Sequence, residues 1–185
     1  METHRSQKAR RSIRLPGFAY SRQGNYFITI CADRRRCLFG RIDENGTVLT
    51  KIGEIIKECW IEIPQHFPDV GIESYGVMPN HLHGILVVNP TSLDVSPQPR
   101  LTLTAESFGK PVSGSIPTII RSFKAAVTER VQQSGPLISG AGWHRGYFER
   151  VLRHSREFVN AKDYIIKNPL RWAFDEENPE RKSPL

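Results

Sequence analysis

Cysteine, acidic residues and long apolar stretches are all scarce in this chain of 185 residues. Its three cysteines, Cys31, Cys37 and Cys59, form no paired framework and match no zinc-ribbon spacing, so we expect a reduced, cytoplasmic setting. No apolar run approaches the roughly 20 residues that a membrane span needs. The charged start of the chain is followed by no apolar segment, as a secretory signal would require. We therefore expect neither a disulfide-stabilised secreted scaffold nor a membrane partner.

The shortage of acidic residues leaves the chain basic, with 26 Lys and Arg against 19 Asp and Glu, a net charge of +7 and a pI near 9.6. This excess suits a polyanionic partner. The charge is clustered in three segments, with aromatic residues beside the last: 5–14, 34–36 and 145–156, with Trp143, Tyr147 and Phe148. Such a mixture can neutralise phosphates while aromatic rings stack on unpaired bases, but an ordinary solvated basic face has the same composition.

The length and the distribution of proline and glycine predict a single domain with extensions. We expect a flexible basic arm at 1–13, one domain at 14–178 and a short tail at 179–185. A segment rich in proline, glycine, serine and threonine, at about 89–114, is expected to be a loop insert within this domain.

The hydrophobic periodicity predicts alternating strands and helices. The strands are expected at 26–32, at 47–50 after an Asn45-Gly46 turn, at 70–77, at 81–88 and within 143–152. The helices are expected at 51–63, from Ser115 to about Val131, and from an N-cap at Ser155 onward. This order predicts an α+β sandwich in which the helices lie on one face of an antiparallel sheet.

Two histidines stand two residues apart on one of these strands. Because side chains alternate between the faces of a strand, His81 and His83 should point the same way and Leu82 the opposite way. Two imidazoles on one face can bind one divalent cation. The pattern alone is also compatible with one surface histidine and one that merely packs.

A second pattern lies on the helix that is expected to begin near Ser155 and to end before Pro169. Tyr164 and Asn168 are four residues apart, so their side chains should share one helix face. Their oxygens can therefore reach the same small volume. A core tyrosine with a hydrated hydroxyl and an asparagine at a helix C-terminus would fit the same spacing.

Taken together, the two patterns resemble a known family. Pro79-Asn80-His81-Leu82-His83 and Tyr164-Ile165-Ile166-Lys167-Asn168-Pro169 are similar to the motifs of the single-tyrosine HUH transposases, in their REP-associated branch. Further stretches fit the same branch: 14–18, 26–31, 37–40 and 171–174. The resemblance spans roughly residues 12 to 178.

The resemblance implies a ferredoxin-like fold, with the histidine strand central in the sheet and the tyrosine helix near it. It implies that Tyr164 attacks single-stranded DNA and forms a 5′-phosphotyrosine, as in DNA transposition. His81 and His83 would hold the metal, and we expect Asn168 to supply a third ligand through its carbonyl oxygen. Such a donor set suits Mg²⁺ or Mn²⁺. Asp163 lies on another helix face and is not assigned as a base.

The partner implied is single-stranded or hairpin DNA, bound by a monomer or a homodimer. Basic side chains would contact phosphates, and Trp143 or Tyr147 would stack on a base. The candidate DNA-binding residues are Arg10, Arg11, Arg14, Lys124, Arg145, Arg150, Arg153, Trp143 and Tyr147.

Other functions fit parts of the same patterns. A histidine-triad nucleotide hydrolase needs a further histidine at position 85, which is Ile85 here. A zinc hydrolase needs a third ligand, and His144 or His154 could serve, although no pattern marks either. The absence of a second tyrosine motif argues against two-tyrosine rolling-circle enzymes. A hairpin-binding protein of the same fold without turnover stays open, although all four motif residues are retained.

Overall fold

The structure is a computed structural model that describes residues 23–89, 114–135 and 142–181. The predicted arm at 1–13 and nearly all of the predicted insert at about 89–114 lie outside these ranges. The candidate DNA-binding residues Arg10, Arg11 and Arg14 lie outside them as well.

A four-stranded antiparallel sheet forms the centre of the molecule, in the order β4-β5-β1-β6. Its strands are Val70–Val77 (β4), His81–Val88 (β5), Gly24–Cys31 (β1) and Phe148–Leu152 (β6). Two helical crossovers connect the strands in the split β-α-β manner of ferredoxin-like folds. β5 lies between two neighbours and is buried along nearly its whole length, so the predicted central place of the histidine strand is confirmed.

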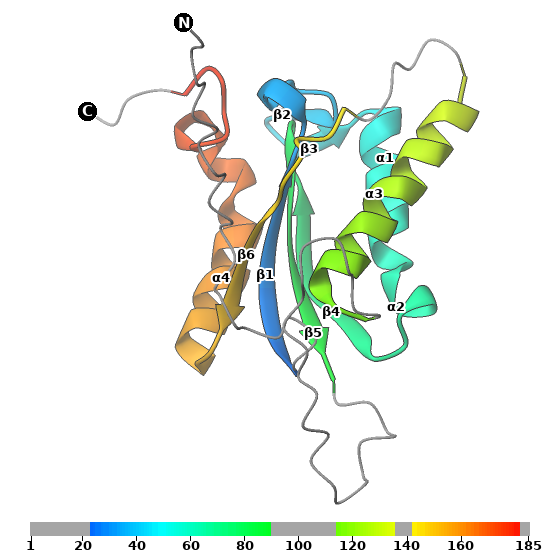
Figure 1. Ribbon diagram of the computed structural model, residues 1–185. Coiled ribbons are helices and arrows are strands. Elements are labelled where there is room, and N and C mark those ends of the chain that lie inside the picture. The colour runs from blue at the N-terminus through cyan, green and yellow to red at the C-terminus, as the bar shows by residue number, and fades with distance from the viewer. Residues whose placement is uncertain (1–22, 90–113, 136–141, 182–185) are drawn as a thin grey trace, which may run out of the picture.

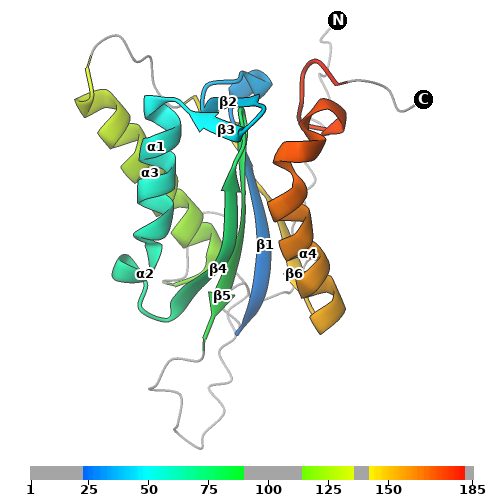
Figure 2. The ribbon, with the colours of Figure 1, turned by 180° about the vertical axis from the view of Figure 1, so that it is seen from behind.

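Helices cover both faces of this sheet, as Figures 1 and 2 show from opposite sides. One face carries Lys51–Ile61 (α1), the short Ile63–His66 (α2) and Ile116–Gln133 (α3), and the other carries Ser155–Lys167 (α4). The predicted α+β sandwich is confirmed, but the expectation that all helices share one face is wrong. The reason is that the sheet is apolar on both faces: Phe27 and Ile85 pack against Ile165 of α4.

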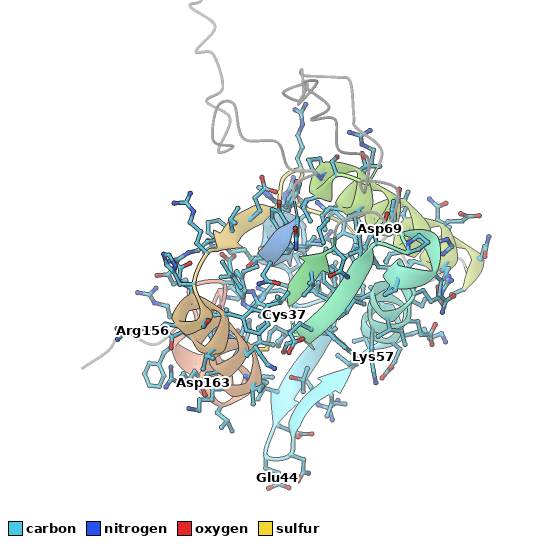
Figure 3. The ribbon with its side chains drawn as sticks, turned by 90° about the horizontal axis from the view of Figure 1, so that it is seen from below. Cys37, Glu44, Lys57, Asp69, Arg156 and Asp163 are labelled. Atoms are coloured by element: carbon cyan, nitrogen blue, oxygen red, sulfur yellow. The ribbon has the colours of Figure 1, made fainter. Side chains whose placement is uncertain are left out.

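Three local expectations are corrected. The short strand predicted at 47–50 is Gly46–Leu49 (β3). It pairs with an unpredicted strand, Gly40–Asp43 (β2), in a separate hairpin whose tip carries Glu44 (Figure 3). The helix expected at 51–63 ends at Ile61, because Pro64 has no N–H to continue the ladder. The N-cap of α4 is His154 and not Ser155, and the Glu157 carboxylate accepts the nearby N–H of Arg153.

Two short 3₁₀ helices complete the described chain. Asp33–Arg35 (η1) follows β1, and Pro169–Phe174 (η2) follows α4 directly. None of the helices in the described ranges is long and apolar enough to cross a membrane.

The main core depends on close contact between α1 and the histidine strand. Trp60 is fully buried, and its ring packs edge-on against Phe123 of α3, with 5.2 Å between the ring centroids. The indole also lies directly on Gly84 of β5. A Cβ at Gly84 would stand 2.2 Å from Cζ2 of Trp60, so only glycine fits under this ring.

We therefore expect Gly84→Ala to destabilise the protein by about 1–3 kcal/mol or more, because the ring is enclosed and cannot move aside cheaply. The free energy of unfolding in urea measures this. Gly71→Ala in β4 is the matched control: its Cβ would have its nearest neighbour at 3.9 Å, so it should change stability little. Equal effects of the two substitutions would contradict the packing argument.

Candidate functional site

β5 brings its two histidines together on the face that α4 covers. The His81 and His83 rings have centroids 4.4 Å apart, and both side chains are buried. The expectation that the two rings share one face is confirmed. Leu82, between them, joins the main core on the opposite face.

The orientation of His81 is determined by the residue before it. The Nδ2 group of Asn80 donates to the backbone carbonyls of Arg35 and Glu177, at 2.9 and 2.7 Å. The Oδ1 atom of Asn80 must therefore face His81, whose Nδ1–H donates to it at 2.9 Å. This tautomer leaves the lone pair of His81 Nε2 directed into the site.

His83 is held in a similar way, by a hydrogen bond of 2.8 Å between its Nδ1 and Oγ1 of Thr29 in β1. The Nε2 atoms of both histidines are buried and have no hydrogen-bond partner within the described ranges. Burial lowers the pKa of His81 to about 4 and the pKa of His83 well below its ordinary value. Both imidazoles are therefore neutral at physiological pH, which is the state that binds metal.

A carboxylate that sequence analysis missed completes the group. Asp175, directly after η2, is buried, and ligand atoms of His81, His83 and Asp175 lie within 4.8 Å of one another. Its Oδ1 accepts the backbone N–H of Glu177 at 2.8 Å. The only sequence signal was its position directly after the 171–174 stretch that carries part of the family resemblance.

Asn168, the predicted third ligand, lies beside this carboxylate. Its Nδ2 donates to Oδ2 of Asp175 at 2.7 Å, and its Oδ1 is buried with no partner among the residues described. Two imidazole nitrogens without partners and two side-chain oxygens form a donor set that fits a divalent cation such as Mg²⁺ or Mn²⁺. Ligation by Asn168 itself stays a prediction.

Tyr164 of α4 borders the same group. Its hydroxyl donates to Oδ2 of Asp175 at 3.5 Å, and its ring packs edge-on against His83, with 5.1 Å between centroids. Burial and then the charge of Asp175 raise the pKa of Tyr164 to about 12, so it is a neutral phenol in the metal-free protein. Asp163 lies on the outer side of α4 (Figure 3) and pairs with Lys167 at 2.6 Å.

Two residues attach the C-terminal segment 175–177 to the end of the sheet where β1 ends and β5 begins: Arg35 and Asn80. Arg35 donates to the carbonyl of Glu176 at 3.0 Å, and its Nε lies 3.1 Å from the Glu177 carboxylate. The Asn80 side chain adds its bond to the carbonyl of Glu177. These contacts hold Asp175 in place opposite the histidines.

An open cavity of about 470 Å³ gives access to this group. His83, Tyr164 and Asp175 line one part of it. The cavity continues along β6 and the N-terminal half of α4, where it is lined by Phe148, Arg150, Leu152, Glu157 and Asn160.

The described candidate DNA-binding residues fall into two groups. Arg145, Arg150 and Arg153 are exposed, and Arg150 pairs with Glu157 at 2.8 Å and lines the tyrosine cavity. The other three are engaged within the fold. Lys124 donates to two carbonyls of the 144–146 turn, and burial lowers its pKa to about 8; Trp143 and Tyr147 pack against the main core.

Comparison with known proteins identifies a relative and a fold. No family model matches the chain. An uncharacterized protein of Haemophilus influenzae Rd is 36% identical over 167 residues, which are 90% of this chain and 92% of the relative. The structure of a REP-associated tyrosine transposase bound to a REP hairpin has a TM-score of 0.52 and 19% identity, over 89% of this chain and 73% of that chain.

The crystal structure of a Deinococcus radiodurans R1 protein, provisionally described as a transposase, has a TM-score of 0.45 and 16% identity, over 79% of this chain and 91% of that chain. That score is too low to support an argument. The TM-score of 0.52 to the hairpin-bound structure establishes a shared fold, in agreement with the resemblance that the motifs carry. The chain belongs to the same family as the Haemophilus influenzae protein and has the fold of a REP-associated tyrosine transposase.

Proposed function

We propose that this protein is a metal-dependent single-tyrosine transposase or endonuclease that cleaves and rejoins single-stranded DNA through a phosphotyrosine at Tyr164. One observation carries the proposal. The Tyr164 hydroxyl, two neutral imidazoles whose Nε2 atoms have no partner in the described structure, and the Asp175 carboxylate meet in one place with an open cavity beside it.

His81 and His83 would hold the divalent ion, with an oxygen of Asp175 or Asn168 as the third ligand. A bound Mg²⁺ or Mn²⁺ supplies Lewis-acid polarisation of the scissile phosphate and offsets its negative charge. The protein fixes the donors beforehand: Asn80 orients His81, Thr29 orients His83, and Asn168 holds Asp175.

Tyr164 would perform the covalent step. Its oxygen attacks phosphorus, the new O–P bond forms, and the bond from phosphorus to the 3′-oxygen breaks. The leaving oxygen keeps the electron pair and takes a proton from solvent, which gives a free 3′-hydroxyl. Where Asn168 is the third ligand, Oδ2 of Asp175, 3.5 Å from the Tyr164 hydroxyl, takes the phenol proton; where Asp175 is the ligand, the proton passes to solvent. Attack of a 3′-hydroxyl on the 5′-phosphotyrosine reverses these steps and rejoins DNA without a nucleotide triphosphate.

Hairpin or single-stranded DNA is the substrate that the charge and the comparison favour. The chain carries a net charge of +7, Arg145, Arg150 and Arg153 are exposed, and Arg150 lines the tyrosine cavity. The hairpin-bound transposase structure, which shares this fold, supports the same class of ligand.

The metal proposal predicts that His81→Ala and Asp175→Asn each weaken Mn²⁺ binding by at least about tenfold, because the first removes a nitrogen donor and the second replaces a charged carboxylate by a neutral amide. Titration of free Mn²⁺ by electron paramagnetic resonance measures the affinity. Asp163→Asn makes the same acid-to-amide change on the outer side of α4 and should leave binding unchanged. If Asn168→Ala binds Mn²⁺ like the native protein, Asn168 is not a ligand.

The nucleophile proposal predicts that Tyr164→Phe removes all cleavage and all covalent adduct, because it deletes the attacking oxygen and retains the ring that packs on His83. DNA affinity and circular dichroism should stay native. Labelled hairpin DNA with Mn²⁺, run on a denaturing gel, detects the adduct. Tyr75→Phe is the matched control, since Tyr75 packs against the main core on the opposite face of the sheet.

Two results would contradict this proposal in different ways. Native cleavage by Tyr164→Phe would make water or another side chain the nucleophile, and the protein a metal-dependent nuclease. Tight hairpin binding by the native protein without any adduct would instead identify a hairpin-binding protein without turnover.

DNA binding should weaken steeply with salt, because each neutralised phosphate releases counterions. We expect the affinity for a hairpin with a single-stranded flank to exceed that for plain duplex at every salt concentration. Fluorescence anisotropy at several salt concentrations tests both points. A flat salt response, or tighter binding of duplex, would exclude the proposed substrate class.

A further inference from the structure

Phe148 is an aromatic residue that the structure leaves open at the edge of the site. It begins β6, where it pairs with Thr29 of β1, and it is 48% exposed. Its two aromatic neighbours in the sequence are placed differently. Trp143 packs on Phe39 and Phe123 in the main core, and Tyr147 packs against the same core.

Phe148 stands between two cavities. It lines the tyrosine cavity of about 470 Å³ and also a second one of about 490 Å³. Thr29 and Glu177 are the other residues that line both, so the two cavities adjoin along this wall. A strand that ran from the second cavity into the tyrosine cavity would cross this shared wall, in which Phe148 is the aromatic residue.

The charges around the two cavities differ in sign. Asp175, Glu176 and Glu177 line the tyrosine cavity, as His83 does. Their negative charges would repel a phosphate unless a bound cation offset them.

The second cavity is lined by Arg34 and Arg35, with Glu177 as its acidic residue, and the Arg34 side chain is 86% exposed. On the other side of Phe148, Arg150 lines the tyrosine cavity. Arginines therefore lie on both sides of the ring. Arg150 pairs with Glu157, and Arg35 pairs with Glu177, so a phosphate bound there would take these two guanidinium groups from their carboxylates, whereas the side chain of Arg34 is largely exposed.

We propose that Phe148 is the platform on which an unpaired base next to the scissile phosphate stacks. This inference rests on the proposed function, and it specifies that the wall shared by the two cavities binds an unpaired base of the DNA substrate. An exposed ring accepts any base, because every base has a π-face, while the arginines on either side contact the phosphates that flank the base. Stacking would fix the position of the strand, and with it the distance between phosphorus and Tyr164.

The test measures binding without cleavage. The probe is a labelled hairpin oligonucleotide with a single-stranded flank, titrated against protein that carries Tyr164→Phe, so that no adduct forms. A series of probes has one abasic site at successive positions of the flank. Phe148→Leu keeps the apolar bulk and removes the ring, Phe148→Trp restores a ring, and Phe174→Ala removes an aromatic of similar exposure (57%) that lines neither cavity.

We expect Phe148→Leu to weaken binding roughly tenfold, as loss of one base–aromatic stack does. One abasic position should weaken binding to the Phe148 protein by a similar factor and have no effect on the Phe148→Leu protein. Phe148→Trp should bind at least as well as Phe148, and Phe174→Ala should be unchanged. Circular dichroism verifies folding.

Unchanged binding by Phe148→Leu would overturn the inference, as would equal sensitivity of both proteins to every abasic site. Failure of the probe to bind at all would overturn it as well. Because these readouts do not involve cleavage, they are independent of the adduct assay. An absent Tyr164 adduct with an intact Phe148 effect would refute the proposed chemistry and leave the stacking site standing.

Discussion

The alternation of side chains along β5 is the constraint on which both the core and the site depend. One face of this strand places Gly84 under the Trp60 ring, and the other places His81 and His83 toward α4. A shift of one residue in register would exchange the two faces completely. Because Trp60 fits only over a glycine, the packing of α1 opposes such a shift. The packing of Trp60 on one face of the sheet thus keeps β5 in the register that places both histidines on the opposite face.

The site carries polar atoms that the rest of the fold leaves unsatisfied. Nε2 of His81, Nε2 of His83 and Oδ1 of Asn168 are buried, and none has a partner in the parts of the chain that the structure describes. A buried polar atom without a hydrogen bond costs about 1–3 kcal/mol. The protein therefore accepts lower stability to keep these donors aligned before a ligand arrives, and a cation that satisfies them would return part of that free energy.

Features that depend on local spacing were predictable from the sequence. Features that depend on where a distant segment folds back onto the sheet were not. The shared face of His81 and His83 follows from the period of a strand. The approach of Tyr164 and Asn168 to one carboxylate follows from the period of a helix. Asp175 could not be found in this way, because η2 must first turn the chain back toward β5. The inward packing of Trp143 likewise depends on the position of α3, which no local pattern encodes.

The contacts of the Asn80 amide have a consequence for the order in which the site forms during synthesis. This one side chain joins the carbonyl of Arg35, the ring of His81 and the carbonyl of Glu177. Two of these partners are made early by the ribosome, and the third nearly one hundred residues later. A nascent chain can therefore pair β1 with β5, and the Arg35 carbonyl can turn the Asn80 amide toward His81, before residue 177 is made. The donor group itself is complete only once the segment around Glu177 has been made, because that segment carries Asp175, so Tyr164 and the full set of donors come together at the end of synthesis.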